Sequence, residues 1–426
     1  MKFRHTPCRI LLFVLFLLVP CSLAQAVESP RNIILMIGDG MGFEHLKTAG
    51  YVDNQGRMTP PFTCFPVQLQ MKTGSLGDRN DSPAPGSVTD SAASATALST
   101  GHKTFNGVLG MAPDRGGRLH PVINLMEAAE QTGRSTGVVT TVPFSHATPA
   151  AFAAHVADRE DYGSIARQML TTSGLDVIAG AGHPYFDDNG HRLRLRVSYR
   201  YVGGRNLWGE LDGGRLGNDA DGDGIFDPWT LVDSTETIRS LADGLTPKRL
   251  LLLAPAASTL QQKRSGPAWV PADAVSFSRD MPTLADLSLA AINRLDDDQD
   301  GFVLMIEGGA IDWAGHANQT GRMIEELDDF ARTVALVERL ITDRLGWDRT
   351  LLLITADHET GGLSDGTWTS HKHTGTPVPL LARGKGAESL PALADAATGL
   401  VDNAALGRWL LQRVMERPSN EESRHE

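Results

Sequence analysis

The sequence predicts an α/β protein with a large, mostly parallel central sheet that is flanked by helices on both faces. Short apolar runs recur along the 426 residues, and each run is followed by a turn and then by a helical pattern. Continuous apolar runs are typical of strands buried on both faces, and their alternation with helices is typical of a parallel sheet. Since no linker or internal repeat divides the chain, we expect one domain over 27–417, with inserted surface segments at about 186–230 and 255–282 and a polar tail at 418–426.

The apolar runs give the expected positions of the strands. These include 32–37, 136–141, 176–179, 249–253, 302–306, 350–355 and 378–382. Helical patterns are expected at 121–131, 284–295 and 323–345. In the last of these segments, five apolar residues recur with the helical period along one face: Ile324, Leu327, Phe330, Val334 and Val337.

The first 26 residues have the pattern of an export signal. Three basic residues, Lys2, Arg4 and Arg9, precede an apolar run at 10–19, and the small residues of an AQA sequence follow as a cleavage motif. The run is too short to span a bilayer, which takes roughly 20 apolar residues. We therefore expect a periplasmic or secreted protein that is free of the membrane after cleavage.

The charge and the cysteines narrow the function classes. The net charge is −12, and the predicted signal holds no acidic residue, so the mature chain is more acidic still. An acidic chain without a basic run argues against nucleic acid or an anionic membrane as the main partner. Cys8 and Cys21 leave with the signal; a lipid anchor on Cys21 is the less favoured alternative, because Pro20 fits a lipoprotein motif poorly. Cys64 alone forms no internal disulfide, so the core or a bound metal must stabilise the fold.

Acidic residues and histidines follow three of the expected strands. They are Asp39 after the first run, Glu307, Asp312 and His316 after the run at 302–306, and Asp357 and His358 after the run at 350–355. A lone aspartate at a strand end is often only a cap or a turn former. Because ligands bind beyond the carboxyl ends of parallel strands, we expect these six side chains to converge on one site.

The spacing of these residues suits metal ions. Asp312 and His316 are four residues apart, so one helical turn presents both to one ion. Imidazole with carboxylate suits zinc, whereas carboxylates with hydroxyls suit magnesium. The segment TSHKHTGTPVP offers a further histidine, and we favour His373 over His371 because of its HTGTPVP context.

The stretch TDSAASATALSTG, at 89–101, is an unusual helix because almost all its side chains are small. Asp90 and Ser91 stand at its start. One interpretation is a simple helix cap, since both residue types satisfy free backbone N–H groups. The other is a nucleophile held against closely packed backbone. The residues alone leave both interpretations open.

Several segments together resemble the alkaline phosphatase family. They include IGDGMG, TDSAASATALSTGHKTFNGVLG, HATPAAFAAH, MPTLADLSLAAI, EGGAIDWAGH, TADHETGG and HTGTPVPLLARG, in family order from residue 31 to about 384. One such motif is weak evidence, but the ordered set is specific. The resemblance implies the three-layer α/β sandwich of that family, and it implies that Ser91 is the nucleophile that forms a phosphoserine.

The resemblance also implies roles for the remaining residues. Asp312, His316 and His373 would hold one zinc ion, and Asp39, Asp357 and His358 would hold a second. Asp39, Thr148 and Glu307 would bind magnesium in a third site. Arg159 would grip the phosphate through its planar guanidinium, oriented by Asp90. Near the third site this chain has His146 and Trp313 where some members have Asp and Lys, so phosphate retention should weaken and zinc is an alternative ion there.

A separate acidic loop, NDADGDGIFD at 218–227, resembles the start of a calcium loop. Asp219, Asp221 and Asp223 are followed by Gly224, and Asp227 closes the segment, but Thr230 stands where an EF-hand would have Glu. A solvated acidic turn is an equal alternative to calcium binding. The run DDDQDG at 296–301 has similar spacing but joins a helix to a core strand, so calcium is less expected there.

These observations predict an exported, metal-dependent phosphomonoesterase that works best in alkali on small phosphate monoesters. A phosphodiesterase or sulfatase of the same superfamily is the alternative, although DSAAS lacks the C/S-x-P-x-R maturation motif of a sulfatase. An alternative of another class is a non-catalytic exported protein that binds calcium or phosphate. The resemblance further implies a homodimer.

Overall fold

The computed structural model describes residues 29–79 and 82–416; the predicted export signal and the polar tail lie outside these residues. Within them, ten strands form one sheet in the order β16-β2-β15-β12-β1-β11-β5-β6-β10-β9. Their bounds are β1 Asn32–Gly38, β2 Val67–Lys72, β5 Ser135–Pro143, β6 Val177–Ala181, β9 Thr230–Val232, β10 Leu250–Leu253, β11 Phe302–Gly308, β12 Thr350–Thr355, β15 Val378–Gly384 and β16 Leu400–Asp402. Only β15 runs against its neighbours in this sheet, so the prediction of a mostly parallel sheet is confirmed.

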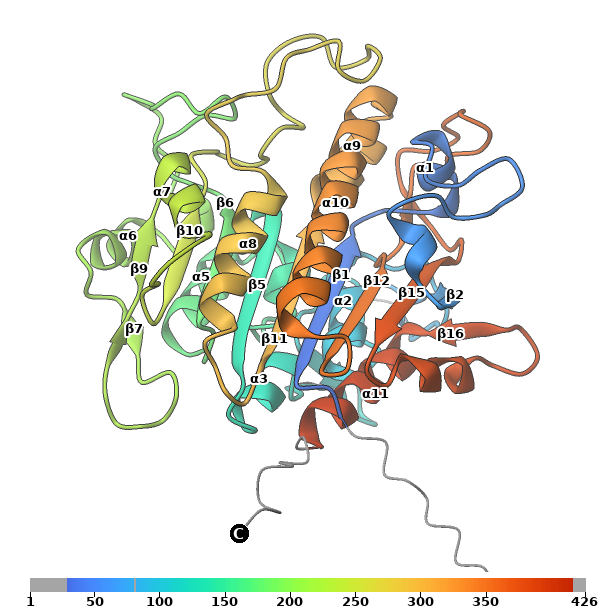
Figure 1. Cartoon of the computed structure of the whole chain (residues 1–426), viewed down its shortest axis with the longest axis horizontal. Coiled ribbons are helices and arrows are strands. Elements are labelled where there is room, and N and C mark those ends of the chain that lie inside the picture. Colours follow the sequence, from blue (N-terminus) through green and yellow to red (C-terminus); the bar gives the residue numbers. More distant parts are fainter. Residues whose placement is uncertain (1–28, 80–81, 417–426) are drawn as a thin grey trace, which may run out of the picture.

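The helices lie on both faces of the sheet, which gives three layers (Figure 1). Helices α8 (Leu284–Leu295) and α10 (Thr320–Leu340) cover one face, and α2 (Ser91–Thr100), α3 (Leu125–Glu130) and α11 (Asn403–Met415) lie on the other. The remaining helices are short: α1 Phe43–Thr48, α4 Ala147–Ala150, α5 Tyr162–Thr171, α6 Arg205–Asp212, α7 Thr235–Ser240 and α9 Ala310–His316. None of the helices in the described part of the chain is both long and apolar enough to cross a membrane.

Three pairs of short strands lie outside the main sheet. They are β3 (Met111–Pro113) with β4 (Leu119–Pro121), β7 (Gly217–Asn218) with β8 (Asp227–Pro228), and β13 (Glu359–Thr360) with β14 (His373–Thr374). The last pair is functionally relevant, because it brings the segment that carries His373 back beside the end of β12.

The expected strands correspond to β1, β5, β6, β10, β11, β12 and β15, with ends that differ by a few residues. Two expected helices differ more. The segment 121–131 becomes helical only from Leu125, because Asn124 caps the helix and its side chain accepts from the N–H groups of Met126 and Glu127. The segment 323–345 is α10, which begins earlier at Thr320, and a final π-helical turn at Ile341–Leu345.

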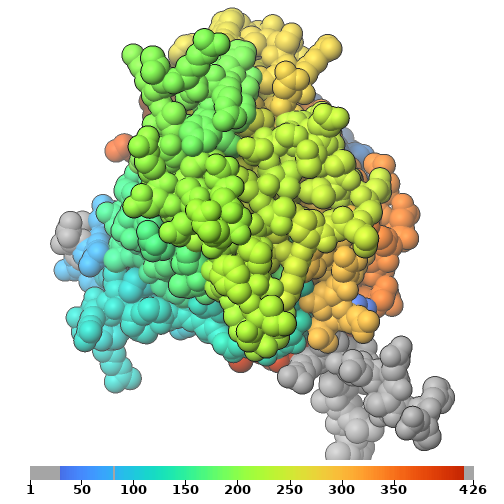
Figure 2. Space-filling model, turned by 90° about the vertical axis from the view of Figure 1, so that its left-hand side faces the viewer, coloured from blue at the N-terminus to red at the C-terminus, as the bar shows by residue number. Residues whose placement is uncertain are grey.

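The predicted apolar face of α10 is largely buried. Leu327, Phe330, Val334 and Val337 are fully buried, whereas Ile324 is partly exposed. The chain between β6 and α8 forms much of one end of the molecule (Figure 2), and the second expected insertion, at 255–282, contains no regular helix or strand. That insertion forms one wall of the cleft that contains the site.

Candidate active site

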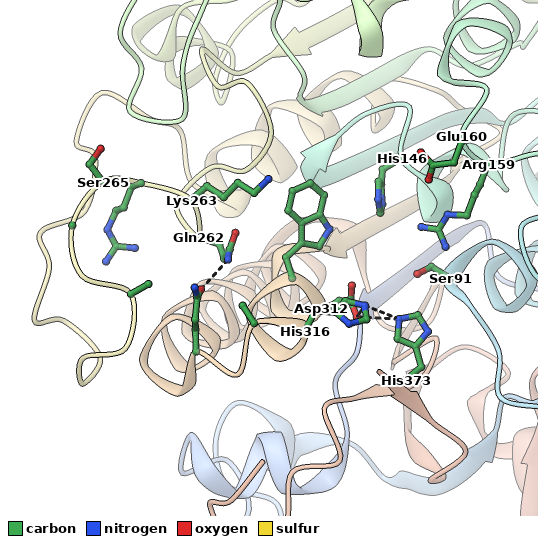
Figure 3. Close-up of a pocket in the computed structure, with 16 residues that line it drawn as sticks. Ser91, His146, Arg159, Glu160, Gln262, Lys263, Ser265, Asp312, His316 and His373 are labelled. Atoms are coloured by element: carbon green, nitrogen blue, oxygen red, sulfur yellow. Dashed lines mark hydrogen bonds and ion pairs between the residues drawn. The ribbon is translucent and has the colours of Figure 1, made fainter. Parts of the chain in front are cut away.

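The functional side chains gather where the parallel strands end. A cleft of about 910 Å³ opens there, and Ser91, Arg159, Asp312 and His373 line it together with residues of the insertion at 255–282. Figure 3 shows Ser91 and Arg159 on one side of this cleft and Lys263 on the other. Segments that are far apart in sequence therefore meet at one edge of the sheet, as the strand ends predicted.

Ser91 stands at the first position of α2, and Asp90 is the cap. One carboxylate oxygen of Asp90 accepts from the backbone N–H of Ala93 at 2.9 Å, and the other accepts from Arg159 Nη1, also at 2.9 Å. Asp90 therefore serves both as a cap and as the partner that orients Arg159. The hydroxyl of Ser91 lies 3.2 Å from His358 Nε2, at the mouth of the helix.

The small side chains let α2 sit against other backbone. All ten of its residues are buried. A side chain on Gly407 of α11 would place its Cβ 2.2 Å from the carbonyl oxygen of Ala97, so the two helices touch backbone to backbone. On the other side, Ser94 Oγ donates to the carbonyl of Asp357 at 2.7 Å, which fixes the helix against the loop that follows β12.

We call Asp39, Asp357 and His358 the inner cluster. All three side chains are fully buried, and His358 Nε2 lies 3.5 Å from Asp39 Oδ1 and 3.3 Å from Asp357 Oδ2. Both carboxylate oxygens of Asp39 and one of Asp357 have no hydrogen-bond partner among the described residues. Burial, together with repulsion between the carboxylates, raises the pKa of Asp39 well above its usual value and raises that of Asp357 to about 6.

A glycine permits the tight turn that brings Asp39 into this cluster. Gly40 has φ +74, and its N–H donates to Asp357 Oδ1 at 3.2 Å. A Cβ at Gly40 would lie 2.8 Å from Thr360 Oγ1 and 3.0 Å from the Cα of Asp312. Both the positive φ and the lack of space require glycine here.

We call Asp312, His316 and His373 the outer cluster. His316 Nε2 and His373 Nε2 each lie 3.4 Å from Asp312 Oδ1, and the two nitrogens are 3.0 Å apart. Asp312 and His316 come from α9, as the four-residue spacing predicts, and His373 comes from β14. Burial alone would raise the pKa of Asp312, but the hydrogen bond with His373 and the neighbouring imidazoles bring it below its usual range.

The donor atoms of these clusters fit metal ions. His316 Nδ1 contacts the carbonyl of His371 at 2.6 Å, and His373 Nδ1 contacts the carbonyl of Thr89 at 2.9 Å. A carbonyl only accepts, so both Nδ1 atoms carry a proton, and the two facing Nε2 atoms are the nitrogens left to bind a further proton or a cation. Lone pairs at 3.0 Å repel unless a proton or a cation lies between them. Imidazole nitrogens backed by carbonyls, beside carboxylates, are typical of zinc sites.

A third group of polar atoms lies beside the inner cluster. Glu307, at the end of β11, is fully buried, and one of its oxygens accepts from the hydroxyl of Thr140. The other Glu307 oxygen and the hydroxyl of Thr148 are buried without a resolved partner in the described residues. Burial raises the pKa of Glu307 to about 8, although the hydroxyls of Thr140 and Thr148 lower it. A buried carboxylate with free hydroxyl and carboxylate oxygens fits a hard cation such as magnesium.

His146 and Trp313 stand close together at this edge, with ring centroids 5.5 Å apart. His146 Nδ1 is buried without a partner among the described residues. Burial, with a contribution from the charge of Arg159, lowers the pKa of His146 to about 3, so the ring is neutral. A neutral imidazole is itself a metal ligand.

The structure places His373, and not His371, in the outer cluster. His371 Nδ1 contacts the carbonyl of His316 at 2.9 Å, so His371 lies on the outside of the same loop. Two further residues were not expected at the site. Thr360 donates to Asp312 Oδ1 at 2.5 Å and contacts His358 Nδ1 at 3.2 Å, so it links the outer cluster to the inner one. The position of Thr360 in the DHETGG motif could have indicated that it lies at the site. The other unexpected residue, Lys263, lies in the insertion, and no sequence pattern indicated its position at the site.

The acidic loop at 218–227 is already paired with the positively charged side chain of Lys248. Carboxylate oxygens of Asp219, Asp221 and Asp227 come within 4.8 Å of one another. Lys248 Nζ lies 2.8 Å from both Asp221 Oδ2 and Asp227 Oδ1. Asp223 does not join this group, because its Oδ1 accepts from the backbone N–H of Ile225. Calcium at this loop remains a prediction and would have to displace the lysine.

A serine hydroxyl at a helix start, next to two clusters of carboxylates and imidazoles, is an arrangement suited to metal-assisted hydrolysis. The family model described as alkaline phosphatase matches residues 30–367. The chain therefore belongs to the alkaline phosphatase family, whose members depend on metal ions.

Relatives agree with this assignment. The chain is 33% identical to alkaline phosphatase 4 of Bacillus subtilis over 348 residues, which cover 79% of this chain and 63% of that protein. It is 34% identical to the alkaline phosphatase of Escherichia coli over 77% of this chain and 70% of that one. Against alkaline phosphatase 3 of Bacillus subtilis it is 33% identical and spans 66% of the relative, so the chain covers less than two thirds of both Bacillus proteins.

Solved structures share the fold. The alkaline phosphatase of the Antarctic bacterium TAB5 matches with a TM-score of 0.65 and 25% identity, covering 92% of this chain and 99% of that one. A variant of the TAB5 protein with a histidine replaced by aspartate has Mg bound in its M3 site.

Proposed function

We propose that this chain is an exported, metal-dependent alkaline phosphatase that hydrolyses phosphate monoesters through a phosphoserine intermediate. One observation carries the proposal: the hydroxyl of Ser91 lies 3.2 Å from His358 Nε2, at the wall of a cleft that Arg159 and the outer cluster share. Family membership supports the reaction class.

In the first step, Ser91 Oγ attacks phosphorus and the bond from phosphorus to the ester oxygen breaks. The alcohol leaves with a proton, and the phosphoryl group stays on Ser91. In the second step, water attacks the phosphoserine and releases inorganic phosphate and the free hydroxyl. The backbone N–H groups at the start of α2 and the guanidinium of Arg159 face the phosphate oxygens and stabilise their charge.

We assign two zinc ions to the outer and inner clusters, and magnesium to Asp39, Thr148 and Glu307. Ions held by these residues would supply Lewis-acid chemistry: they would lower the pKa of a nearby hydroxyl or water and would offset negative charge that develops on oxygen. Zinc in the third site is the alternative, because His146 offers a neutral imidazole nearby.

The third site favours a monoester over a diester. A monoester has more charge on its non-bridging oxygens than a diester, so a further cation beside Glu307 helps the monoester selectively. We therefore rank phosphodiesterase and sulfatase activities below phosphomonoesterase activity. The free oxygens of Thr148 and Glu307 support this ranking.

We also propose export to the periplasm or the medium, based on the pattern in the first 26 residues, and a homodimer, based on the resemblance to the family. Amino-terminal sequencing of the secreted protein tests the first proposal, and sedimentation of the purified protein tests the second.

The covalent step is tested with Ser91→Ala. The clusters stay intact in this variant, so it should fold and bind metal but lose most turnover of a nitrophenyl phosphate. Weak turnover should remain, because water could still attack the phosphate directly. The matched control is Ser87→Ala, on the loop that precedes α2. Phosphate trapped at low pH should label the wild type and Ser87→Ala but not Ser91→Ala. Wild-type protein that turns over substrate without any label on Ser91 would contradict the covalent mechanism.

A further inference from the structure

The insertion at 255–282 places one positive charge over the cleft. Lys263 is exposed, and its Nζ lies 4.4 Å from the centroid of the Trp313 ring. No hydrogen bond or ion pair of this ammonium group is found within the described residues. The Trp313 ring holds this cation only weakly, because the position is exposed.

The residue that follows Lys263 is fixed by a buried network. Arg264 is buried, and its guanidinium donates to the carbonyls of Val275 at 2.8 Å and Ser276 at 3.1 Å and to the carboxylate of Glu325 at 2.9 Å. These contacts tie both ends of the loop to α10.

The residue that precedes Lys263 is fixed as well. Gln262 is buried, and its Nε2 donates to Gln319 Oε1 at 2.9 Å. The backbone N–H of Lys263 donates to Thr259 Oγ1, also at 2.9 Å. Because both neighbours are anchored, the backbone at Lys263 is held in place and its side chain must extend over the cleft.

The position of Lys263 relative to Ser91 determines which part of a bound substrate would lie next to this lysine. In an in-line displacement, the leaving group departs on the side of phosphorus opposite to the nucleophile. Ser91 and Arg159 stand at one side of the cleft and Lys263 stands at the other side, with Asp312 and His316 of the outer cluster between them (Figure 3). A leaving group therefore extends toward Lys263, whereas the transferred phosphoryl group stays near Ser91.

The charges around the cleft make this lysine distinctive. Glu160 also lines the cleft, but its carboxylate is paired with Arg200 at 2.8 Å. Arg264 is paired with Glu325. Lys263 is thus a cation whose charge is not matched by a neighbouring carboxylate in the described residues.

We propose that Lys263 is a substrate-binding residue that selects phosphate monoesters with a second anionic group, a carboxylate or a phosphate, on the leaving group. The inference rests on the proposed phosphomonoesterase function. It assigns a substrate class that the two metal clusters alone do not determine.

The test compares two phosphate monoesters that differ in one charge. One is carboxyphenyl phosphate, and the other is the same compound with its carboxylate converted to a methyl ester. Lys263→Met removes the charge and keeps the length of the side chain. We expect its kcat/KM for the carboxylate substrate to fall about tenfold, mostly through KM, since a hydrogen bond to a charged group contributes at least that much when water is partly excluded. The methyl ester should change by less than about twofold, and the inhibition constant of inorganic phosphate should stay the same. Lys263→Arg should restore the preference.

The control is Arg339→Met, which removes one positive charge from the far end of α10, about 28 Å along the helix from Thr320. It should leave the preference unchanged, which excludes an effect of net charge. An equal loss for both substrates, with weaker phosphate inhibition, would overturn the inference and place Lys263 on the transferred phosphoryl group. No loss for either would also overturn it. Wild-type protein that hydrolyses neither ester would instead show that the proposed function itself is wrong, and the inference would fall with it.

Discussion

Glu130 should make the fold less stable as the pH rises into the alkaline range. This residue ends α3, and its carboxylate accepts from the hydroxyl of Thr136. A Cβ on Gly174 would lie 2.6 Å from the carboxyl carbon, so the carboxyl group packs directly against backbone. Burial, reinforced by the charge of Asp176, raises the pKa of Glu130 to about 9, although Arg249 partly opposes the shift.

The sign follows from comparing the folded and unfolded states. In the unfolded chain Glu130 ionises near its usual value of 4.5, whereas in the folded protein it stays protonated up to about 9. Unfolding therefore releases a proton between these values, and the stability falls as the pH rises through this window. From pH 7 to pH 9 the loss of stability is about 2.3 kcal/mol, at about 1.36 kcal/mol per pH unit, because half of the folded-state groups are already ionised at pH 9. Glu130 also lines a small surface pocket, so solvent screening should reduce this to about 1.5 kcal/mol.

Glu130→Gln removes the titration and keeps an oxygen that accepts from Thr136. We expect the melting temperature of the variant, relative to that of the wild type, to be roughly 2–3 °C higher at pH 9 than at pH 7. This follows because 1 kcal/mol of stability shifts the melting temperature of a chain of this length by roughly 1–2 °C. Thermal melting at both pH values, with zinc and magnesium held constant, measures this gain. Glu210→Gln, at an exposed position of α6, controls for the lost charge. A constant difference between Glu130→Gln and the wild type at both pH values would refute the reasoning.

Three further predictions concern bound ions. Exhaustive chelation should abolish turnover and lower the melting temperature together, because ions that bind only the folded state add to its stability. Added zinc should restore both turnover and melting temperature. Full activity after chelation would exclude a metal mechanism. Millimolar calcium should raise the melting temperature of the wild type but not that of the double variant Asp221→Ala, Asp223→Ala. The rise in the wild type should be modest, because calcium must displace Lys248. Equal shifts in both proteins would mean that the loop is a solvated turn. Glu307→Tyr should lower kcat/KM for a nitrophenyl monoester about a hundredfold and leave the methyl diester little changed, since it removes a contact that matters most for the monoester; an equal fall for both substrates would mean that Glu307 only supports the fold.

The buried strands were predictable from the sequence because burial on both faces leaves continuous apolar runs. The run that became β1, for example, is completely buried. β2 was missed because alternate residues face solvent, so Val67–Lys72 reads as a polar segment. β9 and β16 were missed because three residues carry too weak a pattern. The direction of β15 could not be read either, since an antiparallel strand in a covered sheet has the same apolar pattern as its parallel neighbours.

The site was predictable where its residues lie close together in sequence. Asp312 with His316, and Asp357 with His358, are adjacent or one helical turn apart, so local geometry limits where they can point. Lys263 and Arg264 could not be predicted, because their roles depend on how an irregular insertion folds back onto α9 and α10. The same holds for Lys248, which precedes β10 and forms ion pairs with the acidic loop of the separate β7–β8 pair.

The small helix α2 explains how the proposed nucleophile, Ser91, and the proposed metal ligands keep a fixed relative position. Ser94 Oγ donates to the carbonyl of Asp357, and Asn403 Nδ2 donates in turn to Ser94 Oγ at 3.0 Å, so α11, α2 and the inner cluster form one connected unit. Larger side chains on α2 would separate it from Gly407 and move Ser91 away from His358. Since catalysis by oriented groups is sensitive to shifts of about 1 Å, a helix that buries little apolar area is suited to this place. Its alanines, serines and threonines bring the backbone, and with it the hydroxyl, close to the ligands that activate it.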